Sequence, residues 1–210
     1  MKSIIPSTLK YALYVAGHPL DGFWDLTHEK RGSIAAANII VAATVLVEIL
    51  RITLTNFQFI EVNMEYFNVL TVALRILLPL GLWTVANWSL TTLMDGKGRL
   101  SEIYMATAYA LTPYTIINAA MIIVSQFITR QEGAVYHVLI TFSMIWSVML
   151  ILAAMMEIHD YSAAKAVGSS LLTIIGMGIM VFIFVVFFSL VSDGIAYFVS
   201  LFKELIFRLT

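Results

Sequence analysis

The stretch SIAAANIIVAATVLVEILRITLTN, from Ser33 to Asn56, decides the fold. Apart from Glu48 and Arg51 it carries no charge, and most of its side chains are apolar or small. A helix needs about 20 such residues to cross the hydrocarbon core of a bilayer. Inside that core a helix satisfies its own backbone hydrogen bonds. The stretch therefore predicts a membrane-spanning helix.

Further stretches of the same length and character follow, and the whole chain is poor in charge. Of its 210 residues 60% are hydrophobic and only 12% are charged, whereas a soluble domain carries about 25% charged residues. We therefore predict an all-α integral membrane protein, a five-transmembrane-helix bundle forming one domain over residues 1–210, with its spans within residues 33–191. After the first span, the others run from about Phe67 to Met94, Ile103 to Ile128, Ala134 to Ile158 and Ala166 to Val191.

Two segments outside the spans are predicted to lie at the membrane surface. Residues 1–32 are expected to form a cytoplasmic interfacial elbow. Residues 193–210 are expected to form a separate C-terminal amphipathic helix, because apolar side chains recur there at helical spacing while the polar side chains share the other face. The sequence Asp193-Gly194 marks the expected end of the fifth span, although that span could instead slide into this region. The apolar positions are Phe198, Leu201, Phe202, Leu205, Ile206 and Leu209; the polar ones are Ser200, Lys203, Glu204 and Arg208.

The distribution of basic residues predicts the orientation. On one side, Lys and Arg precede the first span and stand between the second and third and between the fourth and fifth. On the other side, the first loop holds Glu61 and Glu65 with no basic residue, and the next holds only Arg130. Basic residues accumulate on the cytoplasmic side of membrane proteins, so we expect a cytoplasmic N-terminus. The basic residues on the predicted cytoplasmic side are Lys2, Lys10, Lys30, Arg31, Lys97, Arg99 and Lys165.

Several function classes find no support in the sequence. A net charge of −1 gives no electrostatic basis for binding nucleic acid. The chain has no cysteine, which excludes disulfides and thiolate metal sites. The spans contain no Ser-His arrangement and no His-Glu-x-x-His motif, so no catalytic residue, cofactor or metal site is predicted.

Polar residues gather in three segments that the topology brings to the cytoplasmic face. We predict that they contact a partner. In the elbow, Asp21, Asp25 and His28 would share one helix face, which allows a metal hypothesis. An interfacial elbow with Phe23 and Trp24 at headgroup depth is the favoured interpretation. The candidate contact residues are Asp21, Trp24, Asp25 and His28 in the elbow, Asp95, Lys97 and Arg99 after the second span, and His159 and Asp160 after the fourth.

The sequence Asp95-Gly96-Lys97-Gly98 is predicted to form a tight turn in which the glycines adopt positive backbone dihedral angles. It does not have the spacing of a phosphate-binding loop.

Three charges inside the spans form a second candidate site. Glu48 and Arg75 lie at similar depth on the first two spans, so we predict an ion pair between these two helices, with Arg51 reaching toward the interface. The alternative is a small transporter or channel that uses Glu48, Arg51 and Arg75.

Three motifs together resemble a known family. They are the Asp21-Gly-Phe-Trp24 elbow, the Asn87-Trp88 pair that leads into Asp95-Gly-Lys-Gly98, and Tyr109-Ala-Leu-Thr-Pro113-Tyr114 in the third span. From His18 through the fifth span the chain is similar to the prokaryotic branch of the Yip family, the Ypt-interacting proteins. The resemblance implies five helices, a cytoplasmic N-terminus and no catalysis.

The resemblance also bears on the partner. Eukaryotic relatives resemble scaffolds that contact small GTPases, but they do so with a long hydrophilic N-terminal region, and only roughly thirty residues precede the first span here. We therefore expect a non-enzymatic adaptor or accessory subunit in the bacterial plasma membrane. Besides membrane lipids, its expected partner is another integral membrane protein, such as a transporter, rather than a small GTPase.

Overall fold

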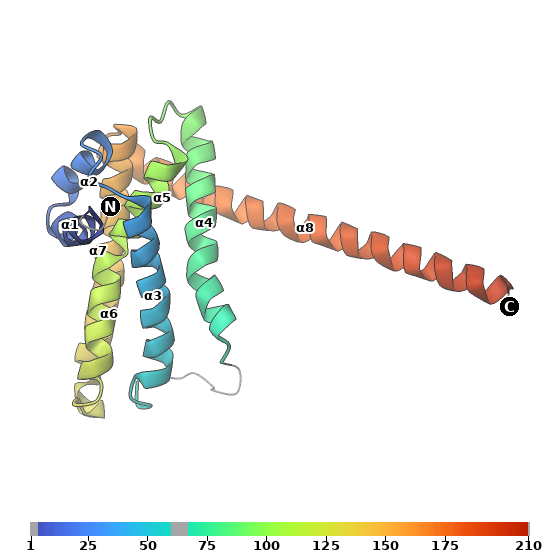
Figure 1. Ribbon diagram of the computed structural model, residues 1–210, viewed down its shortest axis with the longest axis horizontal. Coiled ribbons are helices and arrows are strands. Elements are labelled where there is room, and N and C mark those ends of the chain that lie inside the picture. Colours follow the sequence, from blue (N-terminus) through green and yellow to red (C-terminus); the bar gives the residue numbers. More distant parts are fainter. Residues whose placement is uncertain (1–3, 60–66, 210) are drawn as a thin grey trace.

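A computed structural model describes residues 4–59 and 67–209 of the chain. Within these two ranges the regular secondary structure is helical, and short turns and loops connect the helices (Figure 1). Glu61 and Glu65 of the first outer loop lie outside the described residues. A short 3-10 turn at Arg130–Glu132 precedes α7. The helices are α1 (Ile4–Gly17), α2 (Pro19–His28), α3 (Ile34–Leu54), α4 (Val69–Leu93), α5 (Leu100–Ala110), α6 (Thr112–Val124), α7 (Gly133–His159) and α8 (Ala163–Leu209).

The five predicted spans are confirmed as helices long and apolar enough to cross a membrane. The third of them is made of α5 and α6 together, and the fifth lies within α8. The candidate spans are Ile34–Leu54, Val69–Leu93, Leu100–Val124, Arg130–His159 and Ala163–Glu204.

The third span is broken where the Thr112-Pro113 sequence falls. Pro113 lies in the first turn of α6 and has no backbone N–H to donate to the carbonyl of Tyr109. The Thr112 hydroxyl donates to that carbonyl instead, at 2.7 Å. Tyr109 itself is fully buried. The proline therefore turns the span inside the core while the neighbouring hydroxyl replaces the missing donor.

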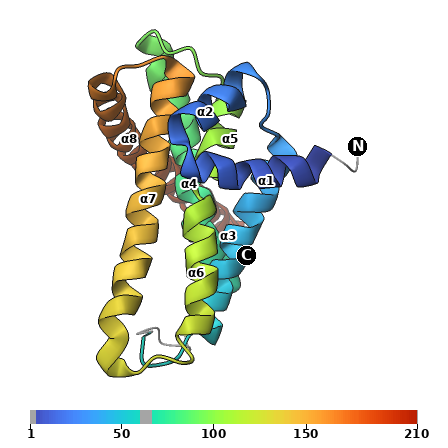
Figure 2. The same cartoon turned by 90° about the vertical axis from the view of Figure 1, so that its left-hand side faces the viewer.

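The elbow is part of the packed core, which corrects one prediction. Helices α1 and α2 lie across the side of the bundle beside α5, α6 and α7 (Figure 2). Phe23 is fully buried inside the protein rather than facing the lipid headgroups, whereas Trp24 is 46% exposed. The Trp146 indole N–H donates to the carbonyl of Ala16 at 3.2 Å, and the Tyr11 hydroxyl donates to that of Gly22 at 2.6 Å. The first of these bonds attaches the elbow to α7, and the second holds α1 against α2 within the elbow.

The expected break before a separate C-terminal helix is wrong. Helix α8 continues without interruption through Asp193 and Gly194 to Leu209. One glycine costs a helix only about 1 kcal/mol, and the apolar helix-forming residues on both sides outweigh that cost. The structure thus agrees with the alternative in which the fifth helix extends into this region. The interfacial location of residues 193–210 stays a prediction.

Only the first part of α8 packs on the bundle. Ser169 and Thr173 are fully buried where α8 meets α4 and α7. Beyond Met180 every described side chain is exposed, and α8 runs away from the other spans at a steep angle (Figure 1). Its 47 residues correspond to roughly 70 Å at 1.5 Å per residue, about twice the thickness of the hydrocarbon core.

Candidate functional site

Three segments that are distant in sequence meet at one end of the bundle and form a cavity of about 350 Å³, here called the end pocket. Four residues predicted to contact a partner, Trp24, His28, Lys97 and Asp160, line it. The predicted convergence of the elbow, the turn after α4 and the end of α7 is therefore found. The other lining residues are Thr27, Glu102, Glu157 and Ile158.

Lys97 and Asp160 connect two of these segments. Their Nζ and Oδ2 atoms are 2.7 Å apart, and both side chains are largely exposed. The hydrogen bond and the charge of Lys97 hold the pKa of the Asp160 carboxyl below its usual value. Asp160 also ends α7 in the left-handed conformation, with φ of 56°. An exposed ion pair contributes little stability, so this pair is better placed to present charge than to hold the fold.

His159, another predicted contact residue, is buried beneath the turn. Only 1% of it is exposed. The Gly98 N–H donates to its Nδ1 at 3.2 Å, so Nδ1 has no proton. The proton is then on Nε2, which donates to the Asn87 Oδ1 atom at 3.0 Å. Asn87 in turn donates to the Thr173 hydroxyl at 3.1 Å. A neutral imidazole thus connects α7, the turn, α4 and α8.

The two glycines of the turn are needed for close approach and not for positive dihedral angles. The prediction that they adopt positive φ is wrong: the residue that does so is Asp95, with φ of 59°. A Cβ atom on Gly96 would lie 2.7 Å from the His159 Nδ1 atom, and one on Gly98 would lie 2.7 Å from its Cε1 atom. The turn can wrap the imidazole only because neither position has a side chain.

Tyr161 covers the other side of this arrangement. Its ring stacks on that of His159 with centroids 5.2 Å apart. Its hydroxyl donates to the carbonyl of Met94 at 2.9 Å, and the Lys165 ammonium donates to the same carbonyl at 3.0 Å. The carbonyl of Met94 at the end of α4 is therefore bound both by Tyr161 in the α7–α8 connection and by Lys165 at the start of α8.

The elbow contributes an aromatic wall to the end pocket. The Trp24 and His28 rings stack with centroids 4.6 Å apart and planes within 9°. Asp25 pairs with Arg31 at 3.2 Å and does not join Asp21 and His28 in a common site. In the described part of the chain no three potential metal ligands lie close enough together to hold an ion.

The remaining predicted contact residues lie around the pocket rather than in it. Arg99 precedes α5, where its backbone N–H donates to Glu102 at 2.9 Å. Asp21 lies within electrostatic reach of Glu157. Sequence reasoning did not select Glu157, Glu102 or Asn87. Glu157 and Asn87 could have been recognised in the sequence, because they place a charge and an amide near the ends of apolar spans.

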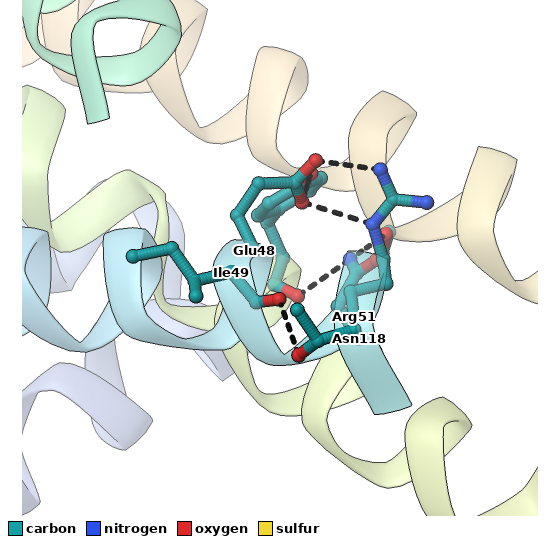
Figure 3. Close-up of polar contacts among 7 residues, drawn as sticks. Glu48, Ile49, Arg51 and Asn118 are labelled. Atoms are coloured by element: carbon teal, nitrogen blue, oxygen red, sulfur yellow. Dashed lines mark hydrogen bonds and ion pairs between the residues drawn. The ribbon is translucent and has the colours of Figure 1, made fainter. Parts of the chain in front are cut away.

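The predicted ion pair between Glu48 and Arg75 is wrong, because Glu48 pairs with Arg51 on its own helix. Figure 3 shows these two side chains facing each other. The Arg51 Nε atom donates to Glu48 Oε2 at 2.9 Å, and the Tyr114 hydroxyl donates to the same oxygen at 3.0 Å. Residues three apart face each other on one helix, so this pair forms without any alignment between helices. Arg75 acts on Glu48 only at longer range.

Uncharged polar groups connect the helices beside this pair. Asn118 donates to the carbonyl of Tyr114 at 2.8 Å and to the Ser143 hydroxyl at 3.1 Å, as drawn in Figure 3. The hydroxyls of Thr44 and Thr115 are 2.7 Å apart. These bonds link α3 to α6 and α6 to α7, as is common within membrane bundles.

Fold and site together define a polytopic α-helical membrane protein whose polar residues gather in a pocket at one end. A family model, the Yip1 domain, matches residues 14–185. The chain therefore belongs to the Yip family. Comparison with curated proteins and with solved structures finds no match.

Replacing Gly98 with alanine should destabilise the protein, because the new Cβ would collide with Ile158 and with the His159 ring. We expect a loss of at least about 1 kcal/mol, measured as a lower unfolding midpoint in detergent. Gly168→Ala is the matched control: nothing lies within 4 Å of its Cβ position, and alanine favours a helix. Equal stability of Gly98→Ala and wild type would contradict the close packing.

A double-mutant cycle should distinguish the partner of Glu48. Glu48→Gln and Arg51→Gln should couple by about 1 kcal/mol, whereas Glu48→Gln and Arg75→Gln should be additive within roughly 0.5 kcal/mol. The measurement is the unfolding free energy of each single and double variant in the same detergent. Strong coupling to Arg75 and none to Arg51 would show that the original interhelical pair was correct.

Proposed function

We propose that this protein is a non-enzymatic adaptor or accessory subunit that binds another integral membrane protein, such as a transporter, through its end pocket. The observation that carries the proposal is the contrast between the lining of the pocket and its support. Four of the eight lining residues are charged, namely Lys97, Glu102, Glu157 and Asp160. The support is a buried hydrogen-bond network through His159. Rigidly held, exposed polar groups suit recognition, because little conformational entropy is lost on binding.

The packing of the elbow supports the same function. Phe23 and Leu26 are buried in the core, while Trp24 from the same helix faces outward beside the pocket. A half-exposed tryptophan next to charged groups is typical of residues that carry binding energy in protein interfaces.

The charges within the bundle favour this function over transport. Glu48, Arg51 and Tyr114 satisfy one another across α3 and α6, which is how a structural pair behaves inside a membrane. A transporter would instead use such charges for its substrate. The alternative function is a small transporter or channel that uses Glu48, Arg51 and Arg75.

We propose further that the protein lies in a bacterial plasma membrane with its N-terminus and end pocket on the cytoplasmic side, since Lys and Arg cluster at that end. The natural absence of cysteine allows a direct labelling test. A cysteine in place of Lys97 should be protected from a membrane-impermeant thiol reagent in intact cells. One in place of Gln58, at the other end of α3, should react. The reverse pattern would overturn the orientation.

Photo-cross-linking in living cells tests the adaptor function. A photoreactive amino acid at Leu20, which is exposed on α2 one turn before Trp24, should capture a reproducible membrane protein, identified by mass spectrometry after purification in mild detergent. The same amino acid at Gln58, which is exposed at the opposite end, is the control and should not capture it. Absence of a repeated partner, together with solute flux into liposomes that Glu48→Gln abolishes, would favour the transporter instead.

A further inference from the structure

The charges that line the end pocket do not balance. Three of its lining residues carry carboxylates and one carries an ammonium group. Lys97 is occupied by Asp160, at 2.7 Å. Glu102 accepts the backbone N–H of Arg99 at 2.9 Å. The pocket is left with negative charge that no side chain of its own lining neutralises.

Glu157 holds the unmatched carboxylate. It is half-buried, and within the described ranges of the chain it has neither a hydrogen bond nor an ion pair. Burial opposes its negative charge most, Asp160 and Asp21 oppose it further, and the nearby His28 favours it. A carboxylate withdrawn from water without a partner is unfavourable, so an incoming cation would relieve this cost.

The pocket also offers a cation more than charge. Trp24 and His28 form a stacked aromatic wall beside Glu157, and the aliphatic stem of a Lys or Arg side chain packs well on such a surface. Recognition of a basic side chain by a carboxylate with an aromatic neighbour combines an ion pair with cation–π attraction.

The membrane itself determines where basic side chains are found. The cytoplasmic ends of transmembrane helices are rich in Lys and Arg, so any partner in the same membrane carries them at the depth where α7 ends. The acidic pocket is complementary in charge to these partner segments.

We propose that the end pocket binds a Lys or Arg side chain from a basic juxtamembrane segment of the partner membrane protein, with Glu157 as its counter-ion. This inference rests on the proposed adaptor function and specifies the chemistry of its partner. Glu157 forms the ion pair, Trp24 covers the stem of the side chain, and Lys97 keeps Asp160 from competing for the same cation.

The test uses the protein in cells, with the partner captured by a photoreactive residue at Leu20, which is exposed on α2 one turn before Trp24. Glu157→Gln should lower the capture yield at least about fivefold, because it removes the charge from a partly desolvated ion pair. Glu157→Asp, which keeps the charge, should retain most of the yield. Glu132→Gln at the opposite end of α7 is the matched control and should leave capture unchanged. Unfolding midpoints of all variants identify any loss that is merely structural.

Carbodiimide treatment of the purified complex then identifies the cation. A lysine in the pocket should become joined to Glu157 by an amide bond detectable by mass spectrometry, whereas an arginine leaves only the loss of capture in Glu157→Gln. Coupling of Glu157 to the amine of phosphatidylethanolamine, with capture unaffected by Glu157→Gln, would assign the pocket to a lipid headgroup and overturn the inference.

The failures of the two proposals are distinguishable. If the partner is captured equally by the wild type and by Glu157→Gln, the inference is overturned while the adaptor function stands. If no variant captures a repeated partner, both fall together.

Discussion

The imidazole of His159 is the interaction on which this end of the molecule depends. It is buried at a point where α4, α7, α8 and the α4–α5 turn converge, and both ring nitrogens are hydrogen-bonded, to Gly98 and to Asn87. A buried polar group without its partner costs about 1–3 kcal/mol, so each bond is needed for the other elements to stay in place. The end pocket is lined by Asp160, the residue after His159, and by Lys97, the residue before Gly98. The geometry of the pocket therefore depends on a buried side chain that does not line it.

The burial of His159 also explains the sequence Asp95-Gly96-Lys97-Gly98, which the sequence alone indicates only as a tight turn. Gly96 and Gly98 lie against His159 so closely that a methyl group at either position would overlap the ring. Lys97, between them, points away from the packed side and pairs with Asp160. One four-residue stretch thus does two things: its glycines close the buried network, and its lysine contributes charge to the exposed pocket. Asn87, on the preceding helix, completes the network from the other side.

The sequence predicts features that follow from apolar length and from the side of the membrane on which a loop lies, but not which neighbours surround a given side chain. The spans follow from apolar length alone, and the structure confirms all five. The convergence of Trp24, His28, Lys97 and Asp160 follows from topology, since alternate loops meet on one side of a membrane. Burial of His159 and Phe23 could not be predicted, because a residue next to a span is equally suited to water or to the core until its neighbours are known. The predicted pair of Glu48 with Arg75 was wrong for a related reason. The prediction rested on similar depth in the membrane, but Arg51 on the same helix as Glu48 forms the pair. Continuity of α8 through Gly194 was missed because a modest local cost was taken as a helix end.

Helix α8 has a buried first part and an exposed later part, and the two have different surroundings. Its first part is buried through Ser169 and Thr173 and joins the His159 network by way of Asn87. Beyond Met180 its described side chains are exposed and mostly apolar. Ile183 and Phe184 line an open apolar pocket together with α4. Such a surface is stable only when it is covered by lipid or by another protein. The Asn87–Thr173 hydrogen bond lies between the buried part of α8 and the end pocket. That bond is one link away from the ring that supports the pocket. The membrane-facing helix and the polar pocket are therefore mechanically connected through Asn87 and His159.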